Sequence, residues 1–320
     1  MIEPSKSYLQ VQYDVRPAKQ VERRMFVDAF QRLSEVGFQV REYQYTGFGL
    51  FYFVDFILFH KFVGINKMLT IEHYSHLEKR VRFNKPFDFV RVAIGEAVEI
   101  IPFLSRDELH ILWLDYDEPI REDRLREIYL AASHLSRRSL LVVTVDIDRR
   151  ALVDRGEKVP ETPREVMEII RAEAGPYFGL PESEDFAARN LPRTSLQIIL
   201  NALNEGLVGR PEIEFLPLFH FVYADGHQML TIGGMLGGAP EKNMIRGIDL
   251  NKVSYLRTDF NRDPYEIIVP RLTRKERHFL DSAMPCGENW KPSEFDLREG
   301  DISAYREIYR FLPVYAELLI

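Results

Sequence analysis

The first half of the chain alternates between amphipathic stretches and short, continuous runs of apolar residues. An amphipathic stretch over about residues 18–36 precedes FQVREYQYTGFG, which predicts a strand that stops at Gly47 and Gly49. The apolar run 50–65 predicts a buried helix, and KMLTIEH after it predicts a buried strand that ends at Glu72. A strand, a turn, a helix and a second strand within about thirty residues have the size of a right-handed crossover.

The same order of elements recurs up to about residue 148. FDFVRVAIGEAVEIIPFL predicts a strand to Ile94 and a helix entered at Gly95, and HILWLDYDEP predicts a strand that ends in Asp115 before the next helix. SLLVVTVDID predicts one more apolar strand. Continuous apolar strands that alternate with helices are typical of a parallel sheet covered on both faces. We therefore expect five parallel strands between residues 39 and 148.

The second half of the chain carries clear helix signals. Thr162 and Glu165 form a capping box that opens one helix, and Thr273 and Glu276 form another. SLQIILNALNEGL predicts a further helix, and an amphipathic helix is expected over about 302–319.

One segment in this half predicts strands instead. EIEFLPLFHFVYADGHQMLTIGGML reads as two strands joined at Ala224-Asp225-Gly226-His227. Asp-Gly between two apolar runs is a strong signal for an antiparallel hairpin. Together the elements predict an α/β protein with a single core and helical additions.

Composition and charge exclude a generally basic protein. The 46% hydrophobic and 28% charged residues are ordinary for a globular chain, and the net charge is −7. A nucleic acid would therefore need a local patch, for which Lys79, Arg80, Arg82 and Lys85 are the candidates. The usual role of such a cluster is a solvated face.

Cysteine use and hydropathy favour the cytoplasm. The single cysteine, Cys286, excludes an internal disulfide and fits a reducing compartment. The N-terminal MIEPSKSYLQ lacks the apolar region of a signal peptide. The most apolar run, 50–65, is interrupted by Asp55, His60 and Lys61 and is too short to cross a bilayer. We expect a cytoplasmic protein without a membrane segment.

Four candidate binding features fall at the carboxyl ends of predicted strands, where open parallel sheets bind their ligands. Gly47 and Gly49 allow the backbone to approach a ligand, and the helix that follows offers free N–H groups. Glu72 ends the second strand, Glu96 follows the third, and Asp115 ends the fourth. Any strand-to-helix turn may use glycine, but the agreement of all four features favours a cofactor site.

The glycine turn lacks two common cofactor motifs. A dinucleotide fingerprint needs glycine where this chain has Tyr52, which disfavours NAD. No Gly-Lys-Ser/Thr sequence follows the glycines, which excludes a phosphate-binding P-loop.

Four motifs, YTGFG, TIEH, IGEAVEIIP and LWLDYD, occur in an order and at spacings that resemble class I S-adenosylmethionine-dependent methyltransferases. Over about residues 17–148 and 212–236 the chain is similar to the bacterial proteins called putative O-methyltransferases. The resemblance implies a Rossmann-like, mostly parallel seven-stranded sheet with helices on both faces and an antiparallel hairpin of the sixth and seventh strands. We expect a methyltransferase domain over 1–236, with a helical insertion at about 160–208, and a C-terminal extension over 237–320 packed on the core.

The resemblance also implies S-adenosyl-L-methionine as the cofactor. In the family, the glycine turn lies beside the methionine part, the acid of the second strand holds the ribose, and residues after the third strand contact adenine. The matching positions are Tyr45, Thr46, Gly47, Phe48, Gly49, Glu72, His73, Gly95, Glu96, Ala97 and Asp115. Tyr45 stands where the family usually has an acid, and Phe51 where it often has a third glycine.

Asp115, Tyr116 and Asp117 are the candidate catalytic residues. Methyl transfer is an in-line displacement, so the enzyme has to align a nucleophile and, for a hydroxyl or an amine, remove a proton. A carboxylate at Asp115 could orient or deprotonate that nucleophile. Asp117 is equally well explained as a cap of the next helix, and Tyr116 could stack on a flat acceptor or close the pocket.

A metal site is not expected. His73 and His76 have a spacing compatible with two metal ligands, but the sequence offers no evident third ligand. Exposed loop histidines are the commoner explanation.

The sequence thus predicts a methyltransferase that acts on an oxygen or nitrogen of an unidentified acceptor. One alternative is a non-catalytic Rossmann-like module that binds a nucleotide or a partner protein, favoured by Tyr45 and Phe51. Another is a nucleic-acid methyltransferase, which rests on the basic cluster at 79–85. The hairpin and the terminal helix offer surfaces for a homodimer.

Overall fold

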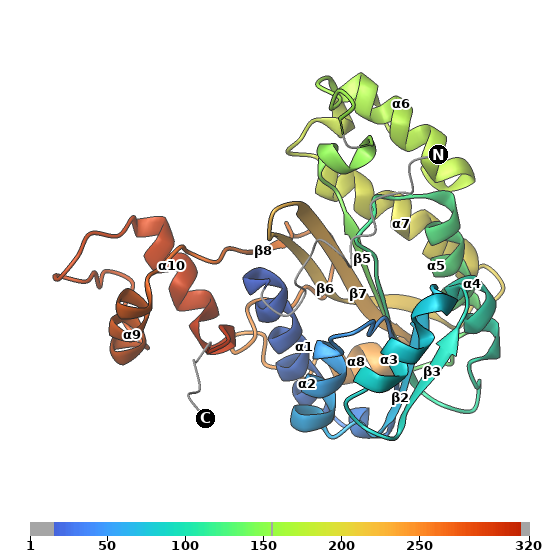
Figure 1. Cartoon of the computed structure of the whole chain (residues 1–320), viewed down its shortest axis with the longest axis horizontal. Helices are drawn as coiled ribbons and strands as arrows, with labels where there is room; N and C mark the ends of the chain where they lie inside the picture. Colours follow the sequence, from blue (N-terminus) through green and yellow to red (C-terminus); the bar gives the residue numbers. More distant parts are fainter. Residues whose placement is uncertain (1–15, 155, 315–320) are drawn as a thin grey trace.

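A mixed eight-stranded sheet forms the centre of the molecule (Figure 1). The computed structural model describes residues 16–154 and 156–314. The strands lie in the order β3-β2-β1-β4-β5-β7-β6-β8. Their bounds are β1 (Gln44–Gly47), β2 (Lys67–Glu72), β3 (Val90–Ile94), β4 (His110–Asp115), β5 (Leu140–Asp146), β6 (Glu214–Ala224), β7 (Gln228–Gly237) and β8 (Tyr265–Ile267).

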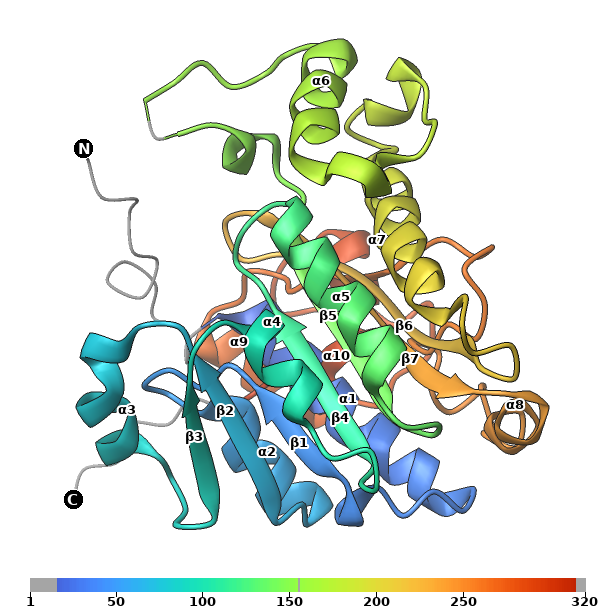
Figure 2. The same ribbon diagram turned by 90° about the vertical axis from the view of Figure 1, so that its right-hand side faces the viewer.

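Helices cover both faces of the sheet. Figure 2 shows α4, α5 and α7 in front of the strands, with α1 and α2 behind them. In Figure 1, α9 and α10 lie to one side, beyond α1. The bounds are α1 (Pro17–Glu35), α2 (Val54–Val63), α3 (Glu78–Asn84), α4 (Ala97–Ile100), α5 (Glu122–His134), α6 (Pro163–Ala174), α7 (Leu191–Leu207), α8 (Ala239–Ile245), α9 (Arg274–Ala283) and α10 (Glu299–Ile308).

The strand directions confirm the predicted α/β fold. β1 to β5 pair in parallel, and β7 lies antiparallel between β5 and β6. The hairpin of β6 and β7 turns at residues 225–227, as predicted from the Asp-Gly signal. An eighth strand, β8, pairs in parallel with β6 at the edge. Its three residues are too short to show in the hydropathy pattern.

Successive side chains of a strand point to opposite faces of the sheet, and each face is covered by different helices. The position of a polar residue at a strand end therefore decides which helices it meets. On one face, Phe26 of α1 packs edge-on against Trp113 of β4, with 4.9 Å between ring centroids. On the other face, Leu112 and Leu114 of β4 belong to the core that includes α5 and α7. Asp115 therefore continues the α1 face of the sheet.

The predicted boundaries around the first turn were wrong. The strand begins at Gln44 and not near 39, and α2 begins at Val54 and not at 50. Leu50 and Phe53 have φ angles of 46° and 47°, in the left-handed region. Residues in that conformation cannot continue a right-handed helix, so the helix starts only after them.

The helix signals of the second half behave as predicted at their starts. The hydroxyls of Thr162 and Thr273 accept hydrogen bonds from the third residues of α6 and α9. The helix expected over 302–319 is shorter, because α10 gives way to a 3-10 turn at Tyr309–Phe311, and 315–320 lies outside the described residues. The expected division into domains stays a prediction. Within 16–154 and 156–314, no helix has the length and apolar character needed to span a membrane.

Candidate active site

The turn between β1 and α2 is held by hydrogen bonds from its backbone to β2. The Gly49 N–H donates to the Thr70 hydroxyl at 2.9 Å, and the Leu50 N–H donates to the carboxylate of Glu72 at 2.8 Å. Within this turn, Leu50 and Phe53 keep their left-handed backbone without being glycine. Such backbone strain persists only where the surroundings impose it, and it gathers at binding sites.

The glycines of this turn are needed for packing. A Cβ atom on Gly47 would lie 2.5 Å from the hydroxyl oxygen of Tyr45, and one on Gly49 would lie 2.5 Å from the ring of Phe53. The space where these residues lack a side chain is therefore filled by aromatic rings and not left open. A ligand in contact with this turn would have to approach another side of its backbone.

Glu72 is a buried carboxylate at the end of β2. Its side chain is 5% exposed and accepts hydrogen bonds from the Leu50 N–H and the Thr70 hydroxyl. Burial raises the pKa of Glu72, and these hydrogen bonds oppose the rise. The residue thus links the β1–α2 turn to the strand end.

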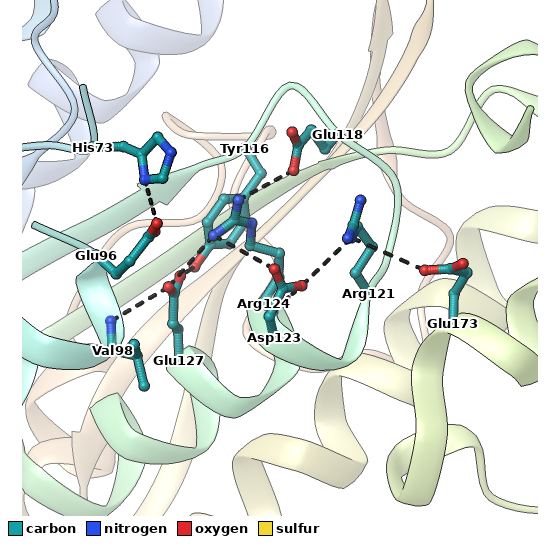
Figure 3. Close-up of polar contacts among 10 residues, drawn as sticks. All are labelled: His73, Glu96, Val98, Tyr116, Glu118, Arg121, Asp123, Arg124, Glu127 and Glu173. Atoms are coloured by element: carbon teal, nitrogen blue, oxygen red, sulfur yellow. Dashed lines mark hydrogen bonds and ion pairs between the residues drawn. The ribbon is translucent and has the colours of Figure 1, made fainter. Parts of the chain in front are cut away.

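The next strand end brings Glu96 to His73. Gly95 follows β3 with a φ of 152°, and its N–H donates to the Glu72 carbonyl at 3.0 Å. Glu96 then precedes α4 and forms an ion pair with the ring of His73, shown in Figure 3. Both side chains are partly exposed, whereas Ala97 is buried. The pair bridges the segments that follow β2 and β3.

Tyr116 has its hydroxyl directed into the protein. It is 6% exposed and donates to Glu127 of α5 at 2.5 Å (Figure 3). Glu127 also accepts the N–H of Val98 in α4, at 3.3 Å. Burial raises the pKa values of Tyr116 and Glu127. Only the ring of Tyr116 could meet a ligand, and it contacts the ring of Phe48 at 5.8 Å.

Tyr45 and Thr46 use their polar groups inside the core. The Tyr45 hydroxyl donates to Asp55 in the first turn of α2, and both residues are buried. Burial, followed by the charge of Asp55, raises the pKa of Tyr45. The Thr46 hydroxyl accepts from the side-chain amide of Gln44 at 3.2 Å. Neither hydroxyl is presented at the strand ends.

Asp115 lies in a charged cluster that the sequence interpretation did not include. Lys19 of α1 is 2% exposed, and its ammonium group lies 2.5 Å from Asp115 and 2.8 Å from Glu22. The same ammonium group donates to the Tyr223 hydroxyl at 3.1 Å and lies 4.3 Å from the ring centre of Trp113. Asp115 keeps 26% of its side chain exposed, whereas Asp117 lies on the exposed loop beyond.

A helical projection contains a signal for this cluster. On a helix, Lys19 and Glu22 fall on the same face as Phe26 and Phe30, all of which are buried. Charged residues on the apolar face of a helix indicate buried polar contacts. The prediction of an amphipathic helix over 18–36 did not take these two charged residues on its apolar face into account.

A second group missed from the sequence is the pair of Asp146 and His227. Asp146 ends β5 and is 4% exposed, and the Nδ1 atom of His227 donates to its carboxylate at 2.7 Å. The His227 side chain is 44% exposed. Burial raises the pKa of Asp146. Because β5 alternates as β4 does, Asp146 lies on the α1 face, as Asp115 does.

Sequence comparison places the chain in a family. The sequence pattern of the family described as "Putative O-methyltransferase" matches residues 11–320. The chain belongs to this family. Membership confirms the resemblance seen in the four motifs and the class of enzyme that it implies, a methyltransferase. Enzymes of the class I type take their methyl group from S-adenosylmethionine. No protein with a curated description matches the chain.

Several solved structures of methyltransferases share parts of the fold. Trm1 from Pyrococcus horikoshii with S-adenosyl-L-methionine has 12% identity and a TM-score of 0.47, covering 69% of this chain and 56% of its own. An O-methyltransferase from Bacillus cereus in complex with SAH has 12% identity and a TM-score of 0.38, covering 73% of this chain and 93% of its own. At such identities and TM-scores, these likenesses support no inference about ligands of this chain.

Proposed function

We propose that this member of the family transfers the methyl group of S-adenosylmethionine to an oxygen or nitrogen atom of an acceptor, at the carboxyl ends of β1 to β4. The observation that carries the proposal is the buried Glu72 carboxylate bound to the N–H of the strained residue Leu50. It borders the segments after β1, β2 and β3, where ligands of open parallel sheets bind. A carboxylate in this place suits the hydroxyl groups of a ribose.

The charges at this edge also fit the cofactor. Of the acids gathered under α1, Asp115 is the one that keeps 26% of its side chain exposed, whereas burial raises the pKa values of Glu22 and Asp55. A positively charged sulfonium would be favoured next to the carboxylate of Asp115. When bound, S-adenosylmethionine supplies an electrophilic methyl group. The chain would hold it through Glu72 and through Glu96 with Ala97.

Two groups held by charged partners, Asp115 and His227, lie on the α1 side of the strand ends. Asp115, held by Lys19, would orient the nucleophile of the acceptor. His227 would take its proton, because Nδ1 is bound to Asp146 and Nε2 of the neutral ring then accepts. From strand spacing and rise, the α-carbons of Asp115 and Asp146 are about 8 Å apart. That separation leaves both groups close to one acceptor.

Calorimetry with S-adenosylmethionine tests the cofactor half of the proposal. We expect saturable binding to the unaltered protein and at least tenfold weaker binding to Glu72→Ala. Glu108→Ala is the matched control, because Glu108 precedes β4 at the opposite end of the strands and pairs with exposed Lys67. The absence of binding at millimolar cofactor, with intact folding, would contradict the proposal.

That negative outcome would favour the non-catalytic module. Its supporting observation is the filling of the glycine turn by the rings of Tyr45 and Phe53. If the cofactor binds, formation of S-adenosylhomocysteine can be screened against hydroxyl and amine acceptors. Asp115→Asn and His227→Gln should then lower turnover more than cofactor affinity.

Nucleic acid is the less favoured acceptor. Arg82 pairs with Glu78 and Lys85 with Asp88, so half of the basic cluster is neutralised within its own segment. Arg80 instead lies over the ring of Phe51, 3.8 Å from its centre. Binding of RNA or DNA with a steep salt dependence would reverse this preference. The expected homodimer and cytoplasmic location stay predictions.

A further inference from the structure

A pocket of about 860 Å³ opens at the opposite edge of the sheet from the proposed cofactor site. It lies at the C-terminal ends of α5 and α7, beside the loops that lead into β4 and β5. β4 alone separates the two edges by about 17 Å, from its length and the rise of a strand. The residues that matter in it are Arg106, His134, Arg137, Glu205 and Arg210.

Two of these arginines carry charge without a described acidic partner. The Nε atom of Arg106 donates to Nδ1 of His134 at 3.3 Å, and Arg210 donates to the carbonyl oxygen of Ala132. Among the described residues, no carboxylate forms an ion pair with either guanidinium. Arg137 differs, because it forms an ion pair with Glu241, which Arg138 shares. Among the described residues that line the pocket, Glu205 is the one acid.

The two guanidinium groups line the same pocket. Burial and, after it, the nearby charge of Arg106 lower the pKa of Arg210. Like charges gathered in one cavity are stabilised when an anion binds between them. The fork of donors on each guanidinium matches the oxygens of a phosphate or sulfate group.

His134 fixes the direction of Arg106. Its Nε2 atom lies 2.7 Å from the carbonyl oxygen of Leu104, which can only accept, so Nε2 carries the hydrogen. Nδ1 is then left to accept from Nε of Arg106. Because the Nε atom of Arg106 is hydrogen-bonded to His134, its two terminal nitrogens remain for a ligand. A guanidinium held in this way loses less freedom when it binds.

We propose that this pocket binds an oxyanion, a phosphate or sulfate group that is either free or carried as a monoester by a small molecule. The site is independent of the proposed methyl transfer. Arg106 and Arg210 would bind the anion through their guanidinium groups. The volume of the pocket leaves room for an organic group beside Tyr129 and Val208. The competing explanation is structural, since cations also stabilise helix C-termini such as that of α5.

Calorimetric titration of the full chain with inorganic phosphate, at constant ionic strength set with sodium chloride, tests the proposal. We expect saturable binding that sulfate competes away and that weakens at least tenfold in Arg106→Gln and in Arg210→Gln. The matched control is Arg164→Gln, since Arg164 is an exposed arginine of α6 paired with Glu168. It should bind phosphate as the unaltered protein does.

The outcomes separate the two explanations. If the arginines only cap helices, the variants will melt at lower temperature while phosphate binding is absent or unchanged, and the proposal is overturned. Phosphate bound equally by Arg106→Gln and the unaltered protein would overturn it as well.

Titration with phenyl phosphate distinguishes the source of the anion. Tighter binding of phenyl phosphate than of inorganic phosphate indicates a monoester, and equal binding indicates the free ion. S-adenosylmethionine binding is measured separately, so failure here leaves the methyltransferase proposal intact.

Discussion

The ammonium group of Lys19 lies 2.5 Å from the carboxylate of Asp115, joining the first helix of the described chain to the end of β4. The same ammonium group also forms an ion pair with Glu22, whose side chain is fully buried. Burial raises the pKa of Glu22, and the charge of Lys19 opposes the rise. One cation therefore compensates two carboxylates in a mostly buried place.

Replacing Lys19 by methionine should destabilise the protein strongly. The change leaves Asp115 and Glu22 without their cation, and breaking a buried pair of this kind costs roughly 3 kcal/mol. Urea unfolding measures the loss. The double variant Lys19→Met/Glu22→Gln should lose less than the sum of the single variants, because the second change removes one of the unpaired acids.

Lys67→Met provides the control for this experiment. Lys67 pairs with Glu108 at the surface, and the loss of such a pair costs up to about 1 kcal/mol. Equal losses for Lys67→Met and Lys19→Met, or strictly additive effects in the double variant, would show that Lys19 does not compensate the buried acids.

The sheet could be predicted because its strands are apolar on both faces and separated by helices of ordinary length. β4 and β5 are buried almost throughout, and such runs can be told from half-exposed strands. The turn after β1 could not be placed, because its left-handed residues are Leu50 and Phe53. Only glycine or asparagine would have indicated that conformation.

The candidate site could be predicted only in part. Strand ends placed Glu72 and Asp115 correctly at one edge, because the carboxyl ends of parallel strands share it. The interactions of Tyr45 and Tyr116 could not be foreseen, since both depend on acids in helices of different faces. Lys19 was missed because its partner lies 96 residues away.

Glu127 should matter to both stability and cofactor binding. It accepts hydrogen bonds from the Tyr116 hydroxyl and the Val98 N–H, so it links α5 to the segments after β3 and β4. Glu127→Leu leaves the buried Tyr116 hydroxyl and the partly buried Val98 N–H without this acceptor, at a cost of about 2 kcal/mol in the free energy of unfolding. Calorimetry should also show weaker binding of S-adenosylmethionine, because residues 96 and 97 are anchored by this bond.

Two further variants check that interpretation. Tyr116→Phe/Glu127→Leu should be less destabilised than Glu127→Leu alone, since one unsatisfied donor is gone. Glu118→Leu alters an exposed acid that pairs with Arg124 from the rim, and should change stability by about 0.5 kcal/mol or less. A loss as large as that of Glu127→Leu would contradict the buried-acceptor role.

Asp225 at the hairpin tip should stabilise α1. Its two carboxylate oxygens accept the backbone N–H groups of Ala18 and Lys19, at 3.0 and 2.9 Å. These groups have no acceptor inside the helix, and the loss of a cap costs about 1 kcal/mol. Asp225→Ala should therefore lower the unfolding free energy by that amount, whereas Asp225→Asn, which keeps an acceptor, should lose less. Asp88→Ala, at a fully exposed aspartate, is the control.

The contribution of Glu241 to stability should depend on pH. The residue is 1% exposed, and although burial opposes it, hydrogen bonds from Arg137, Gly238 and Arg138 lower its pKa to about 2, from 4.5. A lowered pKa in the folded protein adds stability above pH 4.5 that is lost as the pH falls toward 2. Between pH 5 and pH 3 this loss is on the order of 2 kcal/mol. Urea unfolding of the unaltered protein and Glu241→Gln should show their difference shrinking by that amount over this range, and a constant difference would mean that Glu241 is not held as an anion.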